Sequence, residues 1–152
     1  MRSSVTDFRT NRLPTNTTSP SSSLAPLPNP YHIPYSDLIL DCDPQAYHPY
    51  PPWIVSGVMN GALGEINGVL EYGDRVVERT FEVKAGGVRL LVTSPGDQSP
   101  ISRLYYSELE LLLQGFGLKL GSEGLKRTQC DYRREHQQLP DPWLGVVDLD
   151  DE

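Results

Sequence analysis

Apolar residues are distributed unevenly along the chain. Residues 1–30 contain few of them, whereas the stretch from about residue 33 to 120 is rich in Leu, Val and Ile. Ser, Thr, Pro and Asn supply 19 of the first 30 residues, and such a segment buries too little apolar surface to offset the entropy of ordering its backbone. We therefore predict a disordered tail over residues 1–30, an α+β domain over residues 31–147 and an acidic end over residues 148–152.

Two segments have the periodicity of amphipathic helices. Between Pro52 and Tyr72 the apolar residues fall within about 140° on a helical wheel. Pro52 suits a first helical turn, and Gly73 suits the residue after the last turn. The second helix is predicted to begin at Ser107, the N-cap of a capping box that Glu110 completes.

Alternating apolar and polar residues predict four strands. They are residues 35–43, a hairpin within residues 77–93 and residues 125–134. Gly86 and Gly87 supply the positive φ angles of a tight hairpin turn. Arg79 interrupts the alternation, so we expect Val77 to lie outside the strand. Residues 143–147 are expected to form a short edge strand or to lie across the sheet.

The predicted order of elements is β-α-β-β-α-β. Two right-handed crossovers joined by a hairpin make a two-layer ferredoxin-like (split βαβ) fold, an antiparallel sheet with both helices on one face. The first and last strands are neighbours in this topology, so Cys42 is expected beside Cys130. The two cysteines then form either a disulfide, which requires an oxidising compartment, or a pair of buried thiols.

Charge and length narrow the range of functions. The net charge of the 152 residues is -7, which argues against binding of the phosphate backbone of a nucleic acid. No apolar run is long enough to span a membrane. As written, the N-terminus lacks the apolar segment of a secretory signal. This places the chain inside the cell, whereas a true start that carries a signal would place it outside.

The candidate chemistry in the sequence is weak. Asp41, Cys42, Asp43 and His48 follow no known ligand spacing for a metal. A catalytic Cys42 would need electropositive surroundings, and two aspartates flank it. We therefore predict no catalytic, cofactor-binding or metal site.

Two surfaces are candidates for interaction. Four glycines recur at helical spacing, nearly opposite the apolar stripe of the first helix: Gly57, Gly61, Gly64 and Gly68. Each costs the helix up to about 1 kcal/mol relative to alanine, and a bare backbone permits close approach of another chain; neutral variation of the surface is the alternative. On the open face of the sheet, Ile39 and Leu91 are expected on adjacent central strands. A second copy of the chain, or residues 143–147, would cover them.

Two segments of the domain resemble a group of small uncharacterised proteins of filamentous fungi, many of them predicted to be secreted. The segments are Ser36 to Cys42 and Tyr106 to Leu113, together with the cysteine at position 130. The similarity covers about residues 31–135. The expected architecture is also similar to killer-toxin-like fungal effectors, although this chain has two cysteines and no signal peptide as written. The resemblance implies an effector-like domain and carries over no active-site residue.

These observations favour a non-enzymatic interaction protein with an unidentified protein partner. The alternative is a small-molecule enzyme or binding domain of the dimeric ferredoxin-like type, which requires polar groups that converge in a cavity between sheet and helices. A third class is an intracellular adaptor that uses the Pro-rich tail.

Overall fold

The computed structural model describes residues 27–44, 48–78, 80–94, 103–136 and 143–152. Most of the predicted tail, residues 1–26, lies outside this part of the chain. Residues 27–30 are described and contact the domain. Leu27 packs against the core, and the Asn29 side chain exchanges hydrogen bonds with the backbone of Cys42 (2.9 and 3.2 Å).

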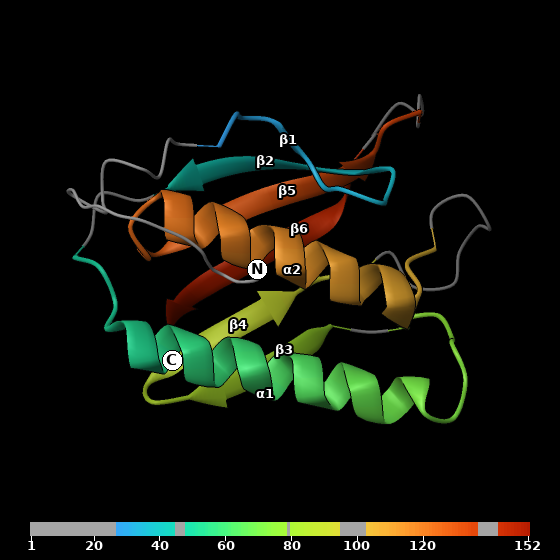
Figure 1. Ribbon diagram of the computed structural model, residues 1–152, viewed down its shortest axis with the longest axis horizontal. Coiled ribbons are helices and arrows are strands. Elements are labelled where there is room, and N and C mark those ends of the chain that lie inside the picture. The colour runs from blue at the N-terminus through green and yellow to red at the C-terminus, as the bar shows by residue number, and fades with distance from the viewer. Residues whose placement is uncertain (1–26, 45–47, 79, 95–102, 137–142) are drawn as a thin grey trace, which may run out of the picture.

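The described chain forms an open antiparallel sheet of six strands with two helices on one of its faces (Figure 1). The order across the sheet is β1-β2-β5-β6-β4-β3. The strands are β1 (Tyr31–His32), β2 (Leu38–Pro44), β3 (Phe81–Ala85), β4 (Val88–Val92), β5 (Thr128–Arg134) and β6 (Trp143–Asp151). The helices are α1 (Pro52–Leu70) and α2 (Tyr106–Ser122). The predicted α+β class is confirmed.

The strand order differs from the ferredoxin-like prediction because of β6. The prediction made residues 143–147 an edge strand or a cover of the sheet. Instead, β6 lies between β5 and β4 and pairs with both. It therefore occupies the central place that the prediction assigned to the first strand, and β2 lies on the outer side of β5.

The acidic end of the chain is part of this central strand. In β6, Val147 and Leu149 are fully buried, while Asp148 and Asp150 alternate with them and are half-buried. Alternation sends the two aspartates to the face away from the helices, where Arg127 binds Asp150 at 2.8 Å. The predicted acidic end at residues 148–152 is thus an amphipathic strand through Asp151 rather than a solvated terminus.

The start of α2 also differs from the prediction. The helix begins at Tyr106 and its N-cap is Tyr105, not Ser107. The Glu108 carboxylate, rather than that of Glu110, accepts the N–H of Tyr105 at 3.0 Å. The Ser107 hydroxyl donates to Asp74, so Ser107 binds another segment of the chain, and a local capping box forms two residues earlier, between Tyr105 and Glu108.

The hairpin agrees with the prediction. Gly86 and Gly87 have φ angles of 62° and 80° and form a two-residue turn between Ala85 and Val88, which are register partners. Val77 lies outside β3 and is buried against the core.

The core fills the space between the sheet and the helices. Its fully buried side chains come from both layers, with Leu40 and Leu90 on strands and Leu112 and Phe116 on α2. Only Lys119 and Thr128 are polar among the buried side chains of the described residues. The Lys119 ammonium is paired there, since it donates to the carbonyls of Leu27 and Pro28 at 3.1 and 3.3 Å.

Candidate functional site

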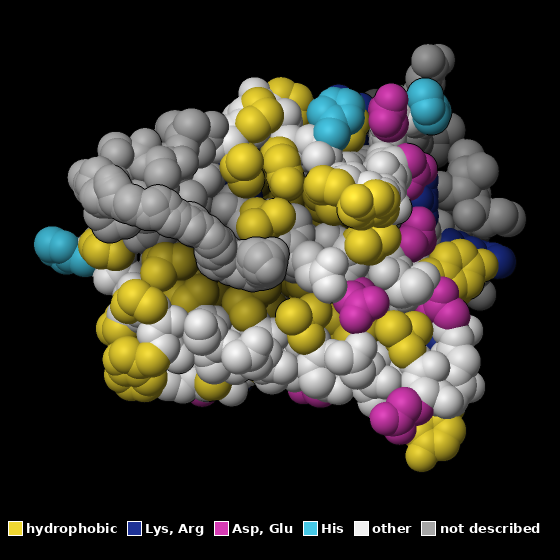
Figure 2. Space-filling model, viewed as in Figure 1, with side chains coloured by type: hydrophobic (Ala, Val, Ile, Leu, Met, Phe, Trp, Pro, Cys, Tyr) yellow, Lys and Arg dark blue, Asp and Glu magenta, His cyan; other side chains and the backbone are white. Residues whose placement is uncertain are grey.

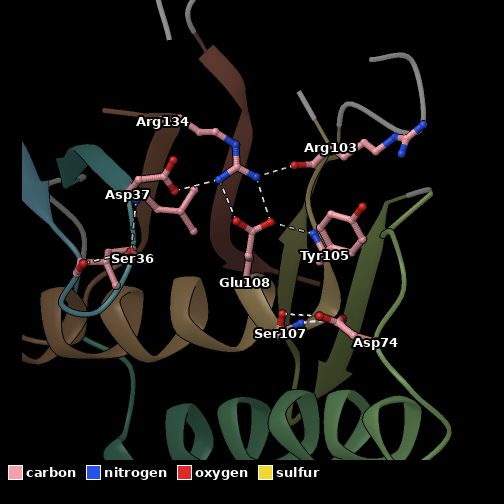
Figure 3. Close-up of polar contacts among 10 residues, drawn as sticks. Ser36, Asp37, Asp74, Arg103, Tyr105, Ser107, Glu108 and Arg134 are labelled. Carbon is pink, nitrogen blue, oxygen red and sulfur yellow. Dashed lines mark hydrogen bonds and ion pairs between the residues drawn. The ribbon is translucent and has the colours of Figure 1, made fainter. Parts of the chain in front are cut away.

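A network of charged side chains holds the N-terminus of α2 (Figure 3). Arg134 of β5 binds both oxygens of Glu108 at 2.7 and 2.8 Å and Asp37 at 2.8 Å. The same guanidinium donates to the carbonyl of Arg103 at 2.5 Å. The hydrogen bonds to Glu108 make the largest contribution to the pKa of Arg134 and raise it, so the guanidinium stays charged.

The segment that follows α1 is tied to the same helix end. Asp74 accepts the backbone N–H of Ser107 at 3.1 Å and its hydroxyl at 2.5 Å (Figure 3). The N–H of Tyr106 donates to the carbonyl of Arg75 at 2.9 Å. These contacts fix the backbone from Asp74 onward against the start of α2.

A groove lies beside this fixed segment, between α1 and the start of β3. It consists of two hollows of about 450 and 430 Å³. Both are lined by Glu65 and Arg75. The larger hollow also reaches Phe81 and Tyr106, and the smaller one reaches Tyr72. The groove is therefore bounded by α1, the edge of the sheet and α2.

The described lining of the larger hollow is predominantly acidic. Glu65, Glu78 and Glu82 line the larger hollow. Among the described residues of its lining, the one cation is Arg75, whose guanidinium lies 5.7 Å from the centre of the Tyr106 ring, within the range of a cation–π contact. This stacking fixes the Arg75 side chain against the wall of the hollow.

The predicted glycine stripe faces outward beside this groove. Gly57, Gly61, Gly64 and Gly68 are all exposed. A Cβ built at Gly57, Gly64 or Gly68 would meet nothing within 4 Å, and Gly68 lines the smaller hollow. Glu65 is the one charged residue in α1, and Figure 2 shows the outer side of this helix as a mostly white band.

The strand next to the stripe is the end of the sheet. β3 pairs with β4, and no other strand of the described residues pairs with its outer side. Because Ala85 and Val88 flank the two-residue turn, they form a hydrogen-bonded pair, and the pattern alternates along the strand. The N–H and C=O groups of Glu82 and Lys84 consequently point away from β4.

The exposed glycines of α1, the outer edge of β3 and the groove between them are continuous. A Cβ at Gly61 would lie 3.5 Å from Val83 of β3, and Glu65 and Glu82 line one hollow. We call this surface the α1–β3 flank. The glycines of the flank are recognisable from their helical spacing in the sequence. The free strand edge has no local signal, because which strand ends a sheet is set by pairing between distant segments.

The other predicted surface is arranged differently from expectation. Ile39 lies on β2 and Leu91 on β4, and β5 and β6 separate the two strands, so the predicted adjacency is wrong. Ile39 is 2% exposed and Leu91 is half-buried. Asp41 and Asp131, which face each other across β2 and β5, are exposed. The open face is therefore polar around these positions.

Cys42 and Cys130 form a disulfide. They are register partners on β2 and β5, with an S–S distance of 2.05 Å and Cα atoms 3.9 Å apart. The predicted contact between Cys42 and Cys130 is confirmed. Of the two alternatives, a disulfide and a pair of buried thiols, the structure contains the disulfide. The bond lies on the helix side of the sheet, within the core, and away from the α1–β3 flank.

Side chains with displaced pKa values do not gather at one site. Burial raises the pKa of Tyr132; burial and a hydrogen bond to Asp151 raise that of Tyr50. Burial, and then Asp150, raise the pKa of the Asp148 carboxyl. None of these three lines either hollow of the groove, so the groove has no acid–base pair of this kind among its described lining residues.

Comparison with known proteins adds no relative. No protein-family model, curated protein or solved structure matches the chain. No helix among the described residues is both long enough and apolar enough to cross a bilayer. Within the same residues, no group of three or more His, Cys, Asp and Glu side chains has an arrangement that would hold a metal ion.

Proposed function

We propose that this chain is a non-enzymatic interaction protein that binds another protein through the α1–β3 flank. The observation that carries the proposal is the continuity of a bare helix side, an acidic groove and an unpaired strand edge. Strand edges bind extended segments through main-chain hydrogen bonds. The fixed start of α2 supplies a rigid wall, which lowers the entropic cost of binding.

The composition of the core supports an interaction role over an enzymatic one. A small-molecule enzyme of the dimeric ferredoxin-like type requires convergent polar groups between sheet and helices. In the described residues that layer is filled by aliphatic and aromatic side chains, and its buried polar residues, Lys119 and Thr128, bond to backbone carbonyls.

The disulfide supports an exported form of this role. Disulfides persist mainly in oxidising compartments outside the cytosol, and Cys42–Cys130 closes a large loop between paired strands. A secreted, effector-like interaction domain is therefore the version of the proposal that we favour, in line with the resemblance of residues 31–135 to predicted secreted fungal proteins.

An unbiased selection tests the proposal. A library of displayed random linear peptides is selected on dilute full-length protein, and the enriched peptides are then measured on two variants. Gly64→Trp fills the flank, and Gly121→Trp adds the same side chain to an exposed glycine of α2 that also has nothing within 4 Å. We expect binding to fall at least about tenfold, or 1.4 kcal/mol, in the first variant and to persist in the second. Equal binding of the enriched peptides to both variants would contradict the proposal.

A further inference from the structure

We infer that the partner of the α1–β3 flank is a second copy of this chain, related by a two-fold axis that passes beside Val83. This inference rests on the proposed function, because it names the partner of the same flank. An isologous contact requires a surface that is complementary to itself. Both parts of the flank, the strand edge and the helix side, meet that requirement.

The edge strand is its own complement. In β3, Glu82 and Lys84 lie at equal distances on either side of Val83. In an antiparallel pair centred on Val83, Glu82 of one copy therefore lies opposite Lys84 of the other, twice. These are also the two residues whose N–H and C=O groups point off the sheet edge, so both main-chain bonds and charges are matched.

The glycine stripe has the same symmetry. Gly57 and Gly68, and likewise Gly61 and Gly64, are placed symmetrically about the point between Ala62 and Leu63. When two copies of α1 meet antiparallel at that point, each glycine of one copy comes opposite a glycine of the other.

One axis serves both the strand and the helix. Ile54 lies beside Gly86, at the turn that ends β3, and Gly61 lies beside Val83, so α1 runs antiparallel to β3. The midpoint of the glycine stripe is thereby placed next to the midpoint of the strand. Pairing of the two strand edges brings the two α1 helices together at the glycines.

Close approach of the two helices explains the bare side of α1. Paired strands lie about 4.8 Å apart, whereas packed helices with ordinary side chains need about 8–10 Å between their axes. A helix above an edge strand meets its symmetry mate at short range, where small residues are required. Trp53 and Tyr72, which are 72% and 92% exposed, lie at the two ends of this contact and are suited to anchor it.

The balance of charge favours a second copy over an unrelated basic segment. A basic strand would match Glu82 but meet Lys84 with like charge. The open sheet face, the surface that the sequence suggested for a dimer, carries Asp41 and Asp131 exposed and opposite each other.

Sedimentation equilibrium of the full chain tests the inference. We expect the mass to rise with concentration from 17.0 kDa to twice that value. Glu82→Lys alone and Lys84→Glu alone place like charges opposite each other, and each should weaken the dimer at least about tenfold. A mixture of the two variants should form the heterodimer, because both opposing pairs are then of opposite charge, and the double variant should regain the wild-type affinity.

The controls separate dimerisation from folding. Lys84 lies opposite Arg89 within the sheet, so Lys84→Glu relieves a like-charge contact in the monomer and should raise its stability while it weakens the dimer. Gly64→Trp should abolish the dimer, and Gly121→Trp should leave it unchanged. The inference would be overturned if the chain is a monomer at every concentration, or if Glu82→Lys and Lys84→Glu leave the affinity of the dimer unchanged. Peptides that bind in a flank-dependent manner to a monomer would keep the proposed function and reject the second copy.

Discussion

Arg134 is expected to be the main polar support of the α2 N-terminus. Its side chain is 17% exposed and that of Glu108 is 25% exposed, so their two-point pair is shielded from water. Asp37 is 43% exposed and its ion pair is weaker for that reason. Arg134→Met keeps most of the apolar stem, removes the guanidinium and leaves Glu108 bound to the N–H of Tyr105.

The cost of this substitution can be worked from the contacts. The paired hydrogen bonds to Glu108 contribute about 2 kcal/mol after allowance for partial exposure. The Asp37 pair and the bond to the Arg103 carbonyl add about 0.5 kcal/mol each. Arg134→Met should therefore lower the free energy of unfolding by about 3 kcal/mol.

Urea denaturation followed by far-ultraviolet circular dichroism measures this cost. A double-mutant cycle with Glu108→Gln isolates the pair, and we expect a coupling of about 2 kcal/mol. Arg134→Lys should recover only part of the loss, because an ammonium does not make the two-point contact. A loss below about 1 kcal/mol with no coupling would show that the network behaves like an ordinary surface ion pair, and the reasoning would be wrong.

Three further predictions concern the core and the sheet. Reduction of Cys42–Cys130, whose residues are 88 apart in sequence, should lower the unfolding free energy by about 4 kcal/mol in the chain-entropy account, as measured by urea titration with and without reductant. Because the Asp148 pKa is raised in the folded state, its charge weakens the fold above that pKa; Asp148→Asn should add up to about 0.5 kcal/mol at neutral pH, and the gain should vanish as the pH falls below about 4. A Cβ at Gly145 would lie 2.5 Å from the Thr93 carbonyl oxygen, so Gly145→Ala should cost about 1–3 kcal/mol in the same titration, whereas Gly121→Ala should be neutral or stabilising.

Local features of the fold were predictable because local chemistry decides them. The apolar spacing of α1, the paired glycines of the hairpin turn and the exclusion of Val77 from β3 all follow from a few adjacent residues. The contact between Cys42 and Cys130 also followed, because it required only that the first strand and the strand after the second helix be neighbours.

The features that failed depend on distant partners. The acidic residues of β6 were predicted to form a solvated end because Arg127, which pairs with Asp150, lies in a distant segment, just before β5. The N-cap of α2 was predicted two residues too late, because Glu108 is held by Arg134 and Ser107 by Asp74. Tertiary contacts determined both features.

The candidate site was predictable in part for the same reason. The glycine stripe could be predicted from its helical spacing alone. The groove and the free edge of β3 depend on how distant segments pack, because β3 ends the sheet by pairing with β4 alone.

Amide hydrogen exchange at Glu82 and Lys84 tests the central claim most directly. Both N–H groups point off the edge of the sheet, so they should exchange rapidly in dilute protein and slowly at concentrations where the flank is paired. The amides of Val83 and Ala85, which face β4, serve as the internal reference and should be protected at both concentrations. Rapid exchange of Glu82 and Lys84 at every concentration would contradict the assignment of the α1–β3 flank as a surface where two copies of the chain pair.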